Sequence, residues 1–93
     1  MRQRYTPDQL YHLRNDIPIG RLITDLDVPT KVADGDFRFR CPQCHEFNTA
    51  INPATNLGRC FRCEENFNPI DMVMLVEGLP FRDAVEFLSQ RRV

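Results

Sequence analysis

The sequence has 93 residues, of which 42% are hydrophobic, and its formal net charge is −1. This length fits one small domain, in which a metal or disulfide adds needed stability to a modest core. The composition argues against a disordered chain and against a uniformly basic nucleic-acid-binding protein, but it is compatible with a local basic surface.

No apolar run is long enough to span a membrane, and the first residues lack the apolar stretch of a secretory signal. We therefore expect a cytoplasmic protein in a reducing environment, where paired cysteines bind metal more often than they form disulfides.

The first predicted element is a short helix over about residues 7–15. Thr6 is the expected N-cap, Pro7 occupies the first helical position, and Gln9 completes a capping box. Helical spacing directs Leu10 and Leu13 inward.

A second helix is predicted over residues 19–26, because its apolar residues recur at helical spacing. Asp16 is its expected cap, and Pro29 ends it. Asp25 and Asp27 form an Asp-x-Asp pair at the end of this helix, which we interpret as solvated rather than catalytic.

A β-hairpin follows. Residues 31–33 and 36–40 flank Asp34-Gly35, a strong signal for a two-residue turn. The run FRFR at 37–40 alternates strictly, so one strand face is aromatic and the other basic. Residues 47–51 and 58–61 are expected to pair as two further strands around a turn at 52–56.

Four cysteines form two Cys-x-x-Cys pairs separated by 15 residues. This spacing is typical of a zinc site in which each pair forms a tight turn, called a knuckle. It predicts one structural zinc ion whose four ligands are Cys41, Cys44, Cys60 and Cys63. His45 could replace Cys44 as a ligand, but four cysteines suffice, so a histidine near the metal is the favoured interpretation.

The C-terminal part is predicted to be helical. Asn68-Pro69 begins a helix that carries Ile70, Val73, Met74 and possibly Leu75, and Gly78 ends it. Another helix covers about residues 81–90, with Phe81, Ala84, Val85 and Leu88 on its apolar face.

These elements indicate a small α+β zinc ribbon: an antiparallel β-sheet with a zinc site, flanked by N-terminal and C-terminal helices. Residues 1–93 would form a single domain. It comprises a helical lead-in at 1–29, the zinc ribbon at 30–67 and C-terminal helices at 68–93.

Several motifs together resemble the N-terminal zinc-binding domain of bacterial and phage DNA primases, over about residues 10–90. They are CPQC at 41–44, CFRC at 60–63, NPIDMVM at 68–74, EGLPF at 77–81 and DAVEFL at 83–88. Two features depart from the family pattern. Cys44 occupies the position of the family's usual histidine, and HEFNT at 45–49 replaces its usual Lys-Thr-Pro-Ser.

The resemblance implies a module that contacts single-stranded template DNA in replication priming. In primases a separate catalytic domain with an acidic metal-binding cluster joins the nucleotides, so this chain is not expected to be an enzyme by itself. The implied partners are single-stranded DNA and, beyond it, a primase catalytic domain or a replicative helicase. A protein bound to DNA in this way would associate with the nucleoid.

The residues give independent support for a nucleic-acid surface. Arginines interleave with aromatic residues in the ribbon, a pattern that suits phosphate contacts and base stacking. The predicted contacts are Arg38, Arg40, Arg59 and Arg62 for phosphates and Phe47 for stacking, with Phe37 and Phe39 turned into the core. An ordinary ribbon core with a solvated arginine face explains the same pattern about equally well.

The alternative function is a zinc-stabilised protein-interaction module that docks on a helicase or another replication or recombination protein. Glu64, Glu65 and Asp71 gather acidic groups just beyond the second knuckle. Such a surface disfavours DNA and suits a basic partner.

Overall fold

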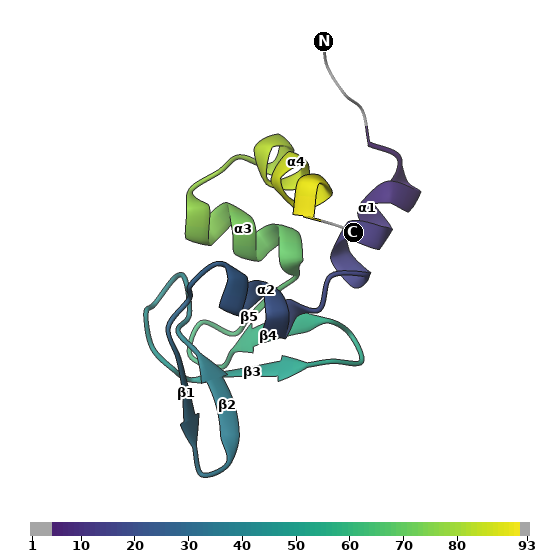
Figure 1. The fold of residues 1–93 in the computed structure, drawn as a ribbon. Coiled ribbons are helices and arrows are strands. Elements are labelled where there is room, and N and C mark those ends of the chain that lie inside the picture. Colours follow the sequence, from purple (N-terminus) through teal and green to yellow (C-terminus); the bar gives the residue numbers. More distant parts are fainter. Residues whose placement is uncertain (1–4, 92–93) are drawn as a thin grey trace.

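The computed structural model describes residues 5–91, which form four helices and two antiparallel sheets (Figure 1). The elements in chain order are α1 (Pro7–Asn15), α2 (Ile19–Asp25), β1 (Thr30–Ala33), β2 (Asp36–Phe39), β3 (Thr49–Asn52), β4 (Leu57–Cys60), β5 (Glu65–Phe67), α3 (Pro69–Glu77) and α4 (Phe81–Arg91). In Figure 1 α2 lies between the sheets and the C-terminal helices, and the β1–β2 hairpin extends away from the helices. The predicted α+β zinc-ribbon class is confirmed. No helix of the described part is long and apolar enough to cross a membrane.

The start of α1 agrees with the prediction. The Thr6 hydroxyl accepts a hydrogen bond from the Gln9 amide at 3.1 Å, and the Gln9 side chain accepts one from the Thr6 amide at 2.8 Å. This capping box satisfies two amides that a helix start leaves without partners. Leu13 is buried and Leu10 partly buried, as their spacing predicts.

The predicted cap of α2 is wrong. Pro18 is the N-cap, and its side chain makes no capping hydrogen bond. Asp16 instead ends α1, where its carboxylate lies 3.0 Å from Nδ1 of His12 one turn earlier. The start of α2 is stabilised from elsewhere, because its Ile19 amide donates to the side chain of Asn56.

Asn56 joins the turn before β4 to the α1–α2 connection. Its side-chain oxygen accepts from the Ile19 amide at 2.8 Å, and its amide group donates to the carbonyls of Arg14 and Ile17, both at 2.7 Å. Asn56 is buried and adopts a positive φ of 56°, a conformation that asparagine tolerates better than most residues. One side chain therefore links segments about forty residues apart.

The β1–β2 hairpin forms around the predicted turn. Asp34 and Gly35 have φ angles of 54° and 82°, the positive values of a type I′ turn. The register pairs Val32 with Phe37 and leaves both exposed near the tip. The expectation that Phe37 enters the core is therefore wrong: its exposed fraction is 40%, and only the ring of Phe39 is fully buried. The hairpin tip extends beyond the reach of the core.

The second sheet contains one strand more than predicted. β3 pairs with β4, with Thr49 opposite Cys60, in the expected antiparallel arrangement. β5 then adds to the free edge of β4 and places Phe67 opposite Gly58. The sequence gives little sign of β5, because Glu65–Phe67 is only three residues long and contains two polar residues.

Phe39 of β2 contacts the three-stranded sheet in two ways. The buried Thr49 hydroxyl accepts from the Phe39 amide at 2.9 Å and donates to the Phe39 carbonyl at 2.6 Å. The ring of Phe39 lies against Gly58, where an added Cβ would come within 2.8 Å of Cζ of the ring. Gly58 therefore leaves the space that the aromatic ring occupies.

The C-terminal helices pack on each other and, through α3, on β5 and α2. The Asn68 side chain accepts from the Asp71 amide, and Asp71 accepts from the Asn68 amide, which forms a second capping box. Gly78 ends α3 with a φ of 66°, as predicted. Buried apolar side chains from all four helices and from both sheets form one core: Leu13, Ile19, Leu22, Ile23, Phe39, Phe67, Ile70, Met72, Val73, Ala84, Val85 and Leu88. Leu75 and Phe81 differ from the prediction, because both remain exposed.

Candidate metal centre and nucleic-acid interface

The four cysteines converge on one point. Their sulfur atoms all lie within 4.8 Å of one another, although they come from two segments separated by 15 residues. Sγ of Cys41 is 3.8 Å from Sγ of Cys63, and Sγ of Cys44 is 3.6 Å from Sγ of Cys60. A tetrahedral zinc site with Zn–S bonds of about 2.3 Å places its sulfurs about 3.8 Å apart. The thiols therefore fit one zinc ion.

Local hydrogen bonds shape each knuckle. The amide of Gln43 points to Sγ of Cys41, and the amide of Cys63 points to Sγ of Cys60, both at 3.4 Å. The residue directly after each knuckle has a positive φ, 65° at His45 and 56° at Glu64. The two knuckles thus repeat one backbone shape, which turns both pairs of sulfurs toward a shared centre.

Burial and mutual hydrogen bonds shift the pKa values of three of the thiols. Burial raises the pKa of the Cys41 thiol. Burial, together with hydrogen bonds to the other three cysteines, raises the pKa of Cys63 to about 12. Burial also acts to raise the pKa of Cys60, but hydrogen bonds from the Cys63 amide and the neighbouring thiols lower it to about 7. Four thiolates this close repel one another, so a divalent cation is the natural means of holding them together.

The metal is structural in this arrangement. Four protein sulfurs fill a tetrahedron and leave no coordination position for a reactive water. His45 is not in the ligand group, so Cys44 fills the position as predicted. The metal centre that the four cysteines form is therefore non-catalytic.

The predicted phosphate-binding arginines have different surroundings. Nη1 of Arg38 donates to the Thr49 carbonyl at 2.9 Å, and Nη2 lies 3.8 Å from Asp36. Arg62 forms an exposed ion pair with Glu46 at 3.2 Å. Arg40 follows β2 and lines a cavity beside the first knuckle. Arg59 lies on β4, opposite Ala50 of β3.

The outer face of the three-stranded sheet carries an exposed aromatic ring beside Arg59. Strand alternation directs Gly58 and Cys60 inward, so Arg59 and the following Phe61 face outward. The guanidinium lies 5.7 Å from the centre of the Phe61 ring and donates to the Asn66 side chain at 3.2 Å. Phe61 is 55% exposed. The sequence favours Phe47 over Phe61 for stacking, although the alternation that turns Cys60 inward places Phe61 on the outer face.

Phe47, the ring predicted to stack on a base, is only partly exposed. The Lys31 ammonium lies 4.8 Å from its ring centre, so one approach to the ring is already occupied by a cation. Lys31 pairs with Arg38 across the hairpin. Phe47, Lys31 and Arg38 therefore form a second basic and aromatic group, separate in chain position from Arg59 and Phe61.

Comparisons with known proteins agree with this geometry. The family model described as the CHC2 zinc finger, the zinc ribbon of DnaG-type proteins, matches residues 5–93. The DNA primase of Streptomyces coelicolor is 25% identical over 91 residues, which cover 96% of this chain and 14% of that protein. The DNA primases of Neisseria meningitidis serogroups A and B are each 33% identical over 72 residues, which cover 74% of this chain and 12% of each relative. The chain thus spans less than one-sixth of the length of these relatives.

Proposed function

Because this chain belongs to the CHC2 zinc finger family, we propose that it binds single-stranded DNA as the template-recognising module of a primase during replication priming. One structural zinc ion, held by the four cysteines, maintains its shape. The module does not join nucleotides by itself, and a separate primase catalytic domain or a replicative helicase would act with it. Residues 1–93 would work as a single domain in the cytoplasm, at the nucleoid when bound to DNA.

The observation that carries this proposal is the exposed Phe61 ring beside the partly buried Arg59 on the outer face of the sheet. A flat exposed ring stacks on an unpaired base, and an adjacent guanidinium reaches the phosphate that follows it. Stacking of this kind contributes about 1–3 kcal/mol per base and tolerates any sequence.

The remaining predicted contacts extend this surface. Arg62 is exposed, and its ion pair with Glu46 is easily exchanged for a phosphate, because exposed ion pairs contribute only about 0–1 kcal/mol. Phe47, Lys31 and Arg38 would contact the same strand next to β3, and Arg40 would meet a phosphate beyond them. Binding by so few cations should be weak and sensitive to salt.

The test is fluorescence anisotropy with short single-stranded oligonucleotides and zinc-loaded protein. We expect Phe61→Ala to weaken binding by about 5- to 160-fold, the range that corresponds to one lost stack. Arg59→Ala, Arg62→Ala and the double variant Arg38→Ala/Arg40→Ala should weaken binding and flatten its salt dependence. Phe47→Ala should have a smaller effect than Phe61→Ala, because the Phe47 ring is less exposed.

Phe81→Ala is the matched control. The exposed fraction of Phe81 is 49%, similar to the 55% of Phe61. Phe81, however, begins α4 on the helical side of the molecule. Its removal should leave DNA binding unchanged. Wild-type affinity in folded, zinc-loaded Phe61→Ala and Phe47→Ala proteins would contradict the proposed surface.

A groove beside α3 favours a second candidate, the protein-interaction module. It has a volume of about 260 Å³ and combines the carboxylates of Glu65 and Asp71 with the apolar side chains of Met74 and Leu75. Acidic and apolar groups together suit a basic partner segment rather than DNA. Absence of oligonucleotide binding by the wild type at low salt would favour this candidate.

A further inference from the structure

A cavity of about 230 Å³ lies beside the first knuckle, between the segment that precedes β1 and the end of α3. Its apolar lining comes from three separate parts of the chain: Val28 and Pro29, Pro42, and Leu75 with Val76. Leu75 remains 39% exposed there, although it belongs to a helix that buries most of its apolar side chains. The volume is below that of most drug-sized sites, so the cavity suits a small ligand whose apolar part lies against this lining.

Three polar side chains share this cavity: Arg40, His45 and Asp27. Within the described residues, none of the three side chains forms a hydrogen bond or an ion pair. His45 also has a positive φ of 65°, which the knuckle imposes. The cavity thus offers a guanidinium, an imidazole and a carboxylate to a ligand.

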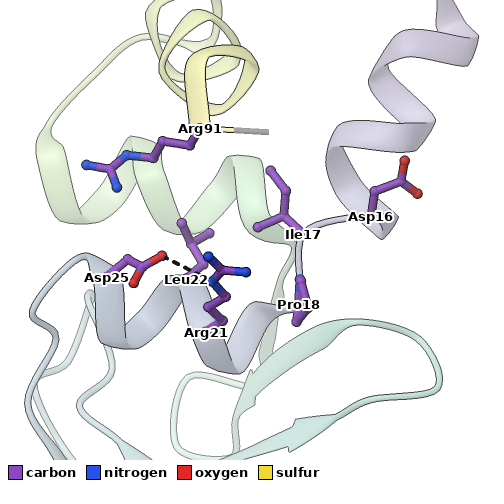
Figure 2. Close-up of a pocket in the computed structure, with 7 residues that line it drawn as sticks. All are labelled: Asp16, Ile17, Pro18, Arg21, Leu22, Asp25 and Arg91. Atoms are coloured by element: carbon purple, nitrogen blue, oxygen red, sulfur yellow. Dashed lines mark ion pairs between the residues drawn. The ribbon is translucent and has the colours of Figure 1, made fainter. Parts of the chain in front are cut away.

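The hollow in Figure 2 provides a contrast. It lies next to α2 and the end of α4 and also contains two arginines and two aspartates. Its charged groups already have partners within the protein. Arg21 pairs with Asp25 at 3.9 Å, the Arg91 guanidinium lies 4.4 Å from the Phe87 ring centre, and Asp16 contacts His12. An external anion would have to compete with these contacts, whereas at Arg40 it would not.

We propose that the cavity beside the first knuckle binds a nucleoside phosphate. The phosphate contacts Arg40 and His45, because a guanidinium presents paired donors that match phosphate oxygens. The base lies against the apolar lining, and the Asp27 carboxylate accepts from a sugar hydroxyl or an exocyclic amine. The ligand is either a free nucleotide or the phosphorylated end of a strand, since both present the same groups.

This site is distinct from the sheet surface of Arg59 and Phe61. Neither Arg59 nor Phe61 lines the cavity. Arg40 is the one residue that the template proposal and the cavity proposal share. The two proposals can therefore fail independently of each other.

The experiment is a titration of the zinc-loaded, ¹⁵N-labelled chain with adenosine 5′-monophosphate, followed through amide shifts. We expect saturable shifts at Asp27, His45 and Leu75, and weaker binding of adenosine and of inorganic phosphate tested separately. Arg40→Ala should weaken nucleotide binding about tenfold or more, because it removes charged hydrogen bonds. Leu75→Ser should weaken it by a smaller factor, because it removes part of the surface that contacts the base.

Two controls separate this site from the other surfaces. Arg21→Ala removes an arginine from the hollow of Figure 2 and should leave nucleotide binding unchanged. Phe61→Ala should weaken oligonucleotide binding without changing nucleotide binding. If nucleotide binding persists while oligonucleotides do not bind, the cavity proposal stands and the template proposal fails.

Oligonucleotides with and without a 5′-phosphate identify the source of the ligand. If the phosphorylated end is the ligand, the phosphate strengthens wild-type binding and this gain disappears in Arg40→Ala. If a free nucleotide is the ligand, the 5′-phosphate adds nothing. The proposal is overturned if no saturable shifts occur at the cavity, if phosphate alone binds as well as the nucleotide, or if Arg40→Ala and Arg21→Ala behave alike.

Discussion

The two β-sheets of this chain are stabilised in different ways. The β1–β2 hairpin has its register set by its own Asp34-Gly35 turn, but only its base is buried, and Val32 near the tip is 71% exposed. The three-stranded sheet carries a metal ligand, Cys60, within β4 and presents its inner face to the core, and Asn56 in the turn before β4 bonds to the α1–α2 connection.

This difference shows that the pairing of two strands and their position in the fold can depend on different contacts. The hairpin needs only local sequence to form, whereas its position depends on Phe39 and Thr49. The three-stranded sheet depends on distant partners throughout, namely the other knuckle, the helices and Asn56. A substitution in the three-stranded sheet should therefore destabilise much of the molecule, whereas one at the hairpin tip should destabilise the hairpin alone.

The largest expected effect comes from Cys60→Ser, which removes a metal ligand from β4. Structural zinc binding contributes about 10–16 kcal/mol in small zinc modules, comparable to the whole stability of a small domain. We expect loss of the zinc ion and of amide protection across β3, β4 and β5, measured by elemental analysis and hydrogen exchange. Zinc affinity should also fall as the pH falls, because each bound thiolate must first lose its proton.

His45→Ala is the control for the metal centre. It changes a residue adjacent to Cys44 that lies outside the ligand group, so one zinc ion per chain should remain. Loss of zinc from His45→Ala, or full retention in Cys60→Ser, would contradict the assignment of ligands.

Thr49→Val should have the next largest effect, because it removes the hydroxyl that joins the sheets and keeps the side-chain shape. The Phe39 amide and carbonyl would both lose the Thr49 hydroxyl as a partner. Each buried group left without a partner costs about 1–3 kcal/mol, so for the two groups we expect a loss of about 2–6 kcal/mol in the free energy of unfolding. Thr49→Ser retains the hydroxyl and should lose much less, as measured by urea denaturation.

Gly58→Ala tests the contact between the sheets through its packing. The added methyl group would lie 2.8 Å from Cζ of Phe39, in a ring that the core holds fixed. Overpacking of this kind costs about 1–3 kcal/mol. Gly20→Ala is the matched control: its added Cβ would meet Cδ1 of Ile51 at 3.7 Å, an ordinary contact, and alanine favours the helix. Equal unfolding midpoints for the two variants would show that Phe39 can move.

Elements with complete local signals were predictable from the sequence. Thr6 and Asn68 begin helices as expected, Gly78 ends one, and Asp34-Gly35 forms its turn. Each of these signals acts within a few residues, so no distant part of the fold is needed to interpret it.

Features that depend on distant partners were not predictable. Asn56 resembles an ordinary turn residue in the sequence, but it caps α2 in place of Asp16. β5 forms because β4 offers it an edge, rather than because of its own composition. Phe37 and Phe39 are two residues apart, so the sequence predicts the same strand face for both. Only the position of the hairpin on the core decides that Phe39 is buried and Phe37 is not.

The candidate sites follow the same division. Spacing alone identified the four metal ligands, because each knuckle is a local structure. The four phosphate contacts, Arg38, Arg40, Arg59 and Arg62, stay a prediction, because the surroundings of each guanidinium depend on tertiary contacts that the sequence does not show.

The smallest expected effect is that of Gly35→Ala at the hairpin tip. Nothing lies within 4 Å of an added Cβ there, so the cost comes only from the positive φ of 82°. That cost is about 1 kcal/mol for a residue with a side chain. Because the tip makes no contact with the core, hydrogen exchange should speed up in β1 and β2 while the zinc content and the protection of β4 stay unchanged. Gly35→Asn should lose less stability, since asparagine tolerates positive φ. Faster exchange in β4 would mean that the hairpin turn supports the metal-bound sheet, against the separation argued above.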